Sequence, residues 1–194
     1  PLHHSYEFTA GLLTAMNTCS TITFARSLKS RDLLADIQET GVTVMNGVPL
    51  IYEKILLGIL NKVKKSAMLK KTLFQLFFNT AKFSDNVIDA LISGFVSERL
   101  SRKERRLTHR LGKVLFKSMR EQAGLNTIRF MVAGGAKLPL AIERGFHALG
   151  MPLFQGYGLT ETSPILATNG HFHYKAGATG FPIEGVELRI DNPN

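Results

Sequence analysis

The sequence predicts an α/β fold in which a parallel or mixed sheet is flanked by helices and interrupted by a helical insertion. Short β-branched or aromatic runs at residues 42–45 and 127–132 are separated by apolar residues at helical spacing. Such alternation favours parallel strands joined by crossover helices. Gly134 and Gly135, directly after the second run, indicate a tight turn. A length of 194 residues suits one domain, and we expect residues 1–194 to form a single unit.

The first third of the chain alternates between helical and extended patterns. Apolar residues recur at helical spacing from Phe8 to Met16, and residues 21–24 form a β-branched, aromatic run that favours an extended conformation. Ser30 is a candidate N-cap for a helix that should end near Gly41. Residues 42–45 then predict a buried strand, and Pro49 suits the first turn of the next helix.

The middle of the chain, residues 49–124, predicts a helical excursion from this scaffold, and this region carries the positive charge. Between Glu53 and Arg129 there are 17 Lys and Arg against 6 Asp and Glu, an excess of 11, whereas the remainder holds 7 against 9. A basic, amphipathic segment suits contact with an anionic membrane surface, and a solvated helical face is the equal alternative. Nucleic acid is not an expected partner, because the segment lacks interleaved aromatic and basic side chains of a known binding type.

The last third returns to α/β patterns. Residues 139–149 predict a helix, Leu153 and Phe154 begin a short strand, and residues 186–190 alternate as an edge strand does. Residues 153–168 are rich in Gly, Thr, Ser and Pro and predict a loop that leaves a strand end. In open α/β sheets, such strand ends are where ligands bind.

The composition indicates the cellular compartment. A single cysteine, Cys19, excludes an internal disulfide and a thiolate cluster, so a reducing cytoplasm is the natural compartment. No apolar run approaches the roughly 20 residues needed to cross a bilayer. The chain begins at Pro1 without methionine and stops just after a strand-like run, so we expect an internal fragment of a longer cytoplasmic protein, peripheral at the inner face of a membrane.

The most informative short motif is Gln-Gly-Tyr-Gly-Leu-Thr-Glu at residues 155–161. Its glycines allow a sharp turn and close approach of another group, and Tyr157 offers a flat face for stacking. The Thr160 hydroxyl and the Glu161 carboxylate suit a phosphate with Mg²⁺. A β-turn with a packed tyrosine and a capping threonine is the alternative, and spacing alone favours it.

Other candidate motifs are weaker taken singly. The glycine turn at residues 133–136 could present backbone amides to a nucleotide, but the motif taken alone favours a plain strand-to-helix turn. His171 and His173 lack a third metal ligand at a usual spacing, so the sequence does not favour a metal site there. Neither a phosphate-binding Gly-Lys-Ser/Thr loop nor a Gly-x-Ser-x-Gly hydrolase elbow is present in the sequence.

Taken in order along the chain, these motifs resemble the adenylate-forming enzymes, which include acyl-CoA synthetases, luciferases and peptide-synthetase adenylation domains. Residues 155–163 are similar to the family's Tyr-Gly-x-Thr-Glu motif, and residues 134–136 to its upstream Gly-Gly-Ala element. Residues 1–4, Pro-Leu-His-His, resemble the family's Pro-x-x-His segment. Residues 180–187 resemble its downstream Gly-x-Pro and Gly-x-Glu stretch, so the likeness spans the whole chain.

The resemblance implies a large N-terminal domain that binds ATP and Mg²⁺, with roles carried over residue by residue. Tyr157 would stack on adenine, Thr160 would hold the α-phosphate, and Glu161 would coordinate Mg²⁺. His4 would sit near the carboxylate and α-phosphate, which makes it, with Thr160 and Glu161, a candidate catalytic residue. The remaining candidate nucleotide-binding residues are Gly134, Gly135, Ala136, Gln155, Gly156 and Gly158.

Within this family, the long segment at residues 49–124 and its Val-Pro-Leu-Ile-Tyr-Glu-Lys opening look like long-chain acyl-CoA synthetases. The resemblance therefore implies a parent enzyme that activates a long-chain fatty acid with ATP and passes it to CoA. An acceptor such as a carrier protein or an amine is the alternative, and a basic lipid- or nucleic-acid-binding module is a weaker one. Lys137 departs from the family's usual proline, and the phosphate loop, the ribose-binding Asp and the C-terminal catalytic Lys are absent from these residues. We therefore expect the fragment alone to be inactive.

Overall fold

The computed structural model describes all residues except 1, 66–116, 123, 171–173 and 192–194. Its centre is a five-stranded mixed sheet with the order β1-β2-β3-β4-β5. Three strands, β1 (Val44–Gly47), β2 (Phe130–Ala133) and β3 (Leu153–Gly158), are parallel. Two further strands, β4 (Ile165–Thr168) and β5 (Phe181–Pro182), follow in antiparallel pairing. The predicted α/β class and mixed sheet are confirmed.

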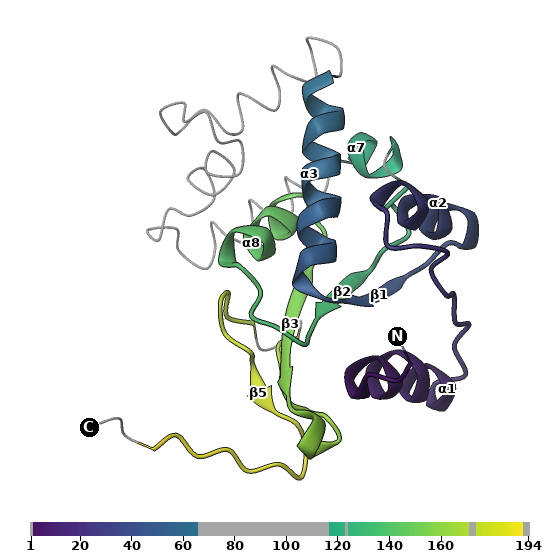
Figure 1. Cartoon of the computed structure of the whole chain (residues 1–194). Helices are drawn as coiled ribbons and strands as arrows, with labels where there is room; N and C mark the ends of the chain where they lie inside the picture. Colours follow the sequence, from purple (N-terminus) through teal and green to yellow (C-terminus); the bar gives the residue numbers. More distant parts are fainter. Residues whose placement is uncertain (1, 66–116, 123, 171–173, 192–194) are drawn as a thin grey trace, which may run out of the picture.

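Helices cover the parallel part of the sheet on both sides (Figure 1). On one side lie α2 (Ser30–Thr40), α3 (Pro49–Lys65), α7 (Lys117–Gln122) and α8 (Leu140–Ala148). The predicted helix is confirmed, and its C-cap is Gly41, whose φ of +65° is the left-handed conformation typical of that position. The predicted N-cap is wrong, because Lys29 takes that position and Ser30 is the first residue of the helix. Pro49 opens α3, as its fixed φ and missing N–H favour.

The other side of the sheet carries the first helix, which has two parts. The segment η1 (Glu7–Leu13) is a π-helix, and α1 (Thr14–Asn17) continues it as an α-helix. The side-chain amide of Asn46 on β1 donates to the carbonyl of Ala10 at 3.0 Å, which holds η1 against the strand. The predicted helical spacing from Phe8 to Met16 is therefore confirmed, although η1 is more widely wound than expected.

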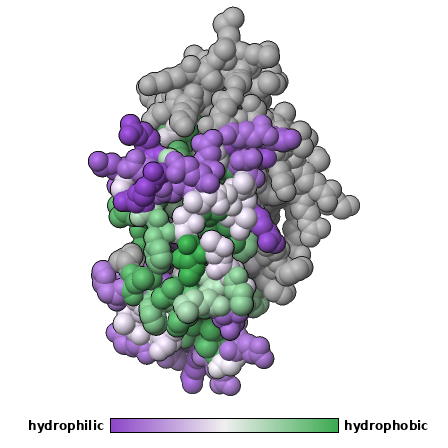
Figure 2. Space-filling model, turned by 90° about the vertical axis from the view of Figure 1, so that its right-hand side faces the viewer, coloured by the Kyte–Doolittle hydropathy of each residue, from purple (hydrophilic) through white to green (hydrophobic). Residues whose placement is uncertain are grey.

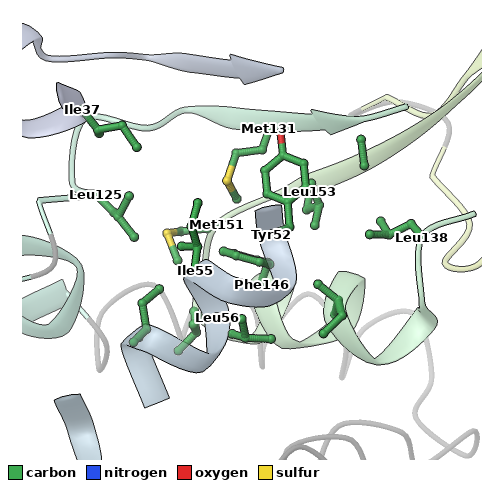
Figure 3. Close-up of a cluster of buried hydrophobic side chains, with 14 of the residues drawn as sticks. Ile37, Tyr52, Ile55, Leu56, Leu125, Met131, Leu138, Phe146, Met151 and Leu153 are labelled. Carbon is green, nitrogen blue, oxygen red and sulfur yellow. The ribbon is translucent and has the colours of Figure 1, made fainter. Parts of the chain in front are cut away.

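Apolar side chains between α3, α8 and the parallel strands form the core (Figure 3). Tyr52 of α3 is fully buried there, edge-to-face with Phe146 of α8 at a centroid distance of 6.0 Å. Its hydroxyl lies 2.9 Å from the carbonyl oxygens of both Met45 and Val132, so a single side chain joins α3 to β1 and β2. Burial raises the pKa of Tyr52, which keeps this hydroxyl protonated as a donor.

Two predicted extended segments do not form strands. Residues 21–24 have no strand partner, and residues 186–190, expected to form an edge strand, are irregular. The alternation at residues 186–190 does not mark a buried face, because Leu188 and Ile190 are exposed. The outer strand is instead the short β5. Strands β1 and β2 begin at Val44 and Phe130, two and three residues later than predicted.

Most of the predicted helical excursion lies outside the described residues. Its two described ends, α3 and α7, are helical, as expected. The expected membrane contact of the basic segment and the cytoplasmic location are not tested by the structure and stay predictions. Among helices in the part of the chain that the structure describes, none has the length and apolar character needed to span a bilayer.

A buried carboxylate links α8 to the segment before β5. Glu143 is fully buried, and its Oε2 accepts the backbone N–H of Gly177 at 2.8 Å. Burial raises the pKa of Glu143, and hydrogen bonds from Gly177 and Tyr174 and the charge of Arg144 only partly offset this. The fold therefore favours the protonated carboxyl group.

We expect Tyr52→Phe to lower the free energy of unfolding of the full-length protein by about 1–3 kcal/mol, because the carbonyls of Met45 and Val132 lose a buried donor. Thr127→Val is the matched control, since the Thr127 hydroxyl also donates to a backbone carbonyl, that of Val42, but at an exposed position. Denaturant unfolding measures both variants. Equal losses would contradict the special role of Tyr52.

Glu143 should make stability depend on pH. A carboxyl whose pKa is raised on folding binds more protons in the folded state, so the free energy of unfolding falls as pH rises above the ordinary value of 4.5. Glu143→Gln removes this titration, so the decline in melting temperature between about pH 5 and pH 8 should become shallower. Glu184→Gln, at an exposed position, should leave the slope as in the wild type. An unchanged slope in Glu143→Gln would contradict the prediction.

Candidate functional site

The predicted site residues gather where β2 and β3 end. Gly134 follows the last residue of β2, and its N–H donates to the carbonyl of Gly47 at 3.1 Å, so it continues the ladder with β1. Gln155 on β3 pairs with Ala133 on β2, which places the two glycine motifs side by side. Both motifs therefore lie at the carboxyl edge of the parallel strands, where open α/β sheets bind ligands.

The glycine motif belongs to a strand and not to a loop, which corrects the prediction for residues 153–168. Strand β3 continues through Gly156 and Tyr157 to Gly158, since these residues pair with β4 in a hairpin. The register shifts between Tyr157 and Gly158, which marks a bulge. The Tyr157 side chain is 45% exposed, so it is available for stacking and is not the packed tyrosine of the alternative interpretation.

Gly158 has no room for a side chain. A Cβ atom there would overlap the backbone carbonyl of Pro164, which comes back along the hairpin. At Gly156, two residues earlier, a Cβ would meet the carbonyl oxygen of Ala167 at an ordinary contact distance of 3.7 Å. The two glycines of the motif thus have different roles, and only Gly158 is required by the backbone packing of the hairpin.

Thr160 and Glu161 lie on a single turn of 3₁₀-helix, η2 (Thr160–Thr162), at the tip of the hairpin. Thr162 holds the turn in place, since its hydroxyl accepts the N–H of Leu159 at 3.1 Å and lies 2.9 Å from the carbonyl of Pro164. Ser163 closes the turn with a φ of +63°, an uncommon conformation for a residue other than glycine. The turn is therefore held by its own side chains, and strain of this kind often accompanies a functional loop.

The first residues of the chain contact both motifs. The aromatic ring of Tyr6 takes the space next to Gly134, where a Cβ would lie 2.6 Å from the ring. The Tyr6 hydroxyl donates to the carbonyl of Val132 at 3.2 Å. Burial, with the nearby charge of Glu7, raises the pKa of Tyr6, so this hydroxyl stays protonated. Ser5 reaches the other motif, with its Oγ 3.2 Å from Oγ1 of Thr160.

His4 precedes these contacts and is fixed by the backbone beside it. Its Nδ1 accepts the N–H of Tyr6 at 3.2 Å. In the neutral imidazole the ring proton then resides on Nε2, which is left as a donor. His4 is exposed, and no hydrogen bond joins it to Thr160 or Glu161 among the interactions of the described residues. The structure thus brings the His4 segment to the Thr160 turn through Ser5.

The donor set fits a nucleotide with one divalent cation. Glu161 is exposed, and the interactions of the described residues include no hydrogen bond or ion pair of its carboxylate. No group of three or more His, Cys, Asp or Glu side chains is placed to hold a metal in the described residues. A single carboxylate beside a hydroxyl matches Mg²⁺, which commonly takes one or two protein carboxylates and completes its shell with phosphate oxygens and water. Lys137 is exposed, and His171 and His173 lie outside the described residues.

Sequence reasoning missed Ser5, Tyr6 and Thr162. The contacts of Ser5 and Tyr6 join residues that a periodic pattern does not relate, since Ser5 and Thr160 are 155 positions apart. Those of Thr162 are local, to Leu159 and Pro164. Two features of the sequence could have indicated Tyr6. It directly follows His4 and Ser5, and Gly134 leaves space for an aromatic ring.

We expect Gly158→Ala to destabilise the full-length protein and to reduce nucleotide binding, since the backbone at Pro164 must shift and the Thr160 turn must move with it. Gly156→Ala is the matched control two residues away and should change the melting temperature much less. Thermal unfolding and ATP titration compare the variants. Similar melting temperatures for the two would contradict the packing argument.

Comparisons with known proteins agree with this architecture. The model of the AMP-binding enzyme family matches residues 1–194. The chain is 30% identical over 162 residues to Long chain acyl-CoA synthetase 2 of Arabidopsis thaliana, covering 82% of this chain and 22% of that protein. It is 27% identical over 184 residues to Long-chain-fatty-acid–CoA ligase 1 of Saccharomyces cerevisiae, covering 93% of this chain and 24% of that protein. The chain thus spans about a quarter of the length of these relatives.

A solved structure gives the same fold. O-succinylbenzoate coenzyme A synthetase from Bacillus subtilis, solved in complex with ATP and a magnesium ion, matches with a TM-score of 0.57 at 18% identity. The match covers 99% of this chain and 28% of that one. The mixed sheet with its flanking helices is thus that of the N-terminal domain of adenylate-forming enzymes. Because the family model matches every residue from Pro1 to Asn194, the chain belongs to the AMP-binding enzyme family.

Proposed function

We propose that the full-length protein activates a long-chain fatty acid with ATP, forming an acyl-adenylate, and transfers the acyl group to CoA. The observation that carries the proposal is the placement of the Thr160 turn against the Ser5 segment, beside the exposed ring of Tyr157. Relatives that are 26–31% identical include several named long-chain acyl-CoA synthetases, which supports the fatty-acid class of substrate.

In the proposed first step, a carboxylate oxygen of the fatty acid attacks the α-phosphorus of ATP. The bond between the α-phosphorus and the bridging oxygen breaks, and pyrophosphate leaves. Negative charge develops on the α-phosphate oxygens, where the Thr160 hydroxyl and the Nε2–H of His4 would donate hydrogen bonds. Mg²⁺, when bound at Glu161, would neutralise charge on the phosphates.

Nucleotide recognition is assigned to the strand ends. The exposed face of Tyr157 is suited to stack on adenine, and the turn at Gly134, Gly135 and Ala136 would border the adenine and the acyl group. Gln155 pairs with β2, and Gly156 and Gly158 pair with β4, so these residues would form the strand end that supports the nucleotide. In the second step the CoA thiol sulfur attacks the acyl carbon and loses its proton to water. The thioester bond forms as the bond between the acyl carbon and the phosphate oxygen breaks, and AMP leaves.

A second acceptor has support of its own. The chain is 26% identical over 211 residues to Long-chain-fatty-acid–[acyl-carrier-protein] ligase AEE15 of Arabidopsis thaliana, covering 28% of that protein. The adenylation step would be the same with a carrier protein as acceptor, since only the attacking thiol changes. A comparison of CoA with an acyl-carrier protein as thiol substrate decides between the two.

The proposed activity predicts pyrophosphate release when the full-length protein receives ATP, Mg²⁺, CoA and palmitate. We expect Glu161→Gln to lower the turnover number on the order of 100-fold, because one stabiliser of the phosphate charge is lost. The Mg²⁺ concentration for half-maximal activity should rise as well, which separates a lost metal ligand from a general loss of structure.

Glu121→Gln on the surface of α7 is the control, and it should keep the wild-type rate. Unchanged turnover in Glu161→Gln would overturn the Mg²⁺ assignment. Absence of pyrophosphate release from the wild type across a series of carboxylic acids would overturn the proposed function itself.

A further inference from the structure

Two hydroxyl groups from distant parts of the sequence meet beside the proposed α-phosphate position. Ser5 Oγ and Thr160 Oγ1 are 3.2 Å apart, and either atom can be the donor. Thr160 is exposed, so its hydroxyl can contact a ligand, whereas Ser5 is partly covered by the surrounding chain. This hydrogen bond directly joins the segment that carries His4 to the η2 turn.

Other contacts fix the chain next to Ser5 and next to Thr160, so the hydrogen bond does not join two unrestrained side chains. On one side of Ser5, the N–H of Tyr6 is bound by His4 Nδ1 at 3.2 Å. The ring of Tyr6 fills the space beside Gly134, which anchors the segment to the end of β2. On the other side of the pair, Thr162 fixes the 3₁₀ turn through its bonds to Leu159 and Pro164.

The direction of the bond matters chemically. Each hydroxyl has one proton to donate and can accept further bonds. When Ser5 donates to Thr160 Oγ1, the acceptor positions of Thr160 facing Ser5 are satisfied, and the Thr160 proton is directed away from Ser5. An oriented donor costs no reorganisation when charge develops on a phosphate oxygen.

We propose that Ser5 is a positioning residue that orients the Thr160 hydroxyl toward the α-phosphate of ATP during acyl-adenylate formation. This inference rests on the proposed function and adds a residue to it. Ser5 acts through Thr160 and does not itself touch the reacting atoms. The pair also makes the orientation of the Thr160 hydroxyl depend on the placement of the segment that carries Ser5.

A purely structural role is a weaker explanation for this pair. The contact is exposed, so breaking it leaves no buried polar group without a partner. The same chain offers a comparable exposed hydroxyl pair away from the motifs, Thr18 Oγ1 and Ser20 Oγ at 2.9 Å, in the turn after α1. This second pair supplies the control.

The test is a double-mutant cycle in the full-length enzyme with Ser5→Ala, Thr160→Val and the double variant, assayed by pyrophosphate release with ATP, Mg²⁺, CoA and palmitate. We expect Ser5→Ala to lower the turnover number about 3- to 10-fold, the range of one hydrogen bond, with a smaller change in the KM for ATP. In the Thr160→Val background, Ser5→Ala should have almost no further effect. Ser5→Thr, which keeps the hydroxyl, should recover most of the wild-type rate.

Ser20→Ala should leave turnover and KM unchanged, which shows that loss of an exposed hydroxyl contact is not sufficient. Rate losses in Ser5→Ala and Thr160→Val that simply multiply in the double variant would overturn the proposal, as would full activity of Ser5→Ala. In either case the proposed function stands, because the wild type still releases pyrophosphate.

Binding of ATP with Mg²⁺, measured by calorimetry on the same four proteins, distinguishes a failure of the Ser5 proposal from a failure of the proposed function. A wild type that binds ATP but releases no pyrophosphate with any acid would refute the proposed function. The cycle in ATP affinity would then still decide the Ser5 role, with non-additive losses supporting it and additive losses overturning it. A wild type that binds no ATP would overturn both.

Discussion

The carbonyl oxygen of Val132 accepts hydrogen bonds from two tyrosines that come from different helices. Tyr52 of α3 reaches it at 2.9 Å from within the core, and Tyr6, just before η1, reaches it at 3.2 Å. Burial keeps both phenols protonated, so each hydroxyl can donate to this carbonyl oxygen. The core and the candidate site therefore share one backbone atom on β2. Tyr6 is the residue next to Ser5, so this contact anchors the segment from which Ser5 reaches Thr160.

Local features of the fold were predictable because they depend on neighbours in the sequence. The end of α2 at Gly41 and the start of α3 at Pro49 follow from backbone preferences of single residues. Strand β2 followed by the glycine turn was likewise legible as an apolar run and its stop signal. The alternation at residues 186–190 misled, because alternation reports two unlike faces and says nothing about whether a partner strand is present.

The candidate site was predictable in its residues and not in its geometry. Tyr157, Thr160 and Glu161 stand out by type and order. The two glycines that flank Tyr157 predicted a loop, whereas the hairpin with β4 extends β3 through them. The contact of Ser5 with Thr160 has no periodic signal, since it depends on how two distant segments meet at the edge of the sheet. Distances across a fold are set by packing, which a single sequence does not display.

The hairpin of β3 and β4 also has a consequence for the order of folding. Its pairing joins residues close in sequence, whereas β1 and β2 pair across more than 80 positions, for example Val44 with Phe130. Closing long loops costs more chain entropy, so we expect the hairpin with its Thr160 turn to form before the parallel strands align. In this order, Ser5 would contact Thr160 only after β1, β2 and the first helix have assembled. We therefore expect the hydrogen bond between Ser5 and Thr160 to form only after the parallel strands have aligned.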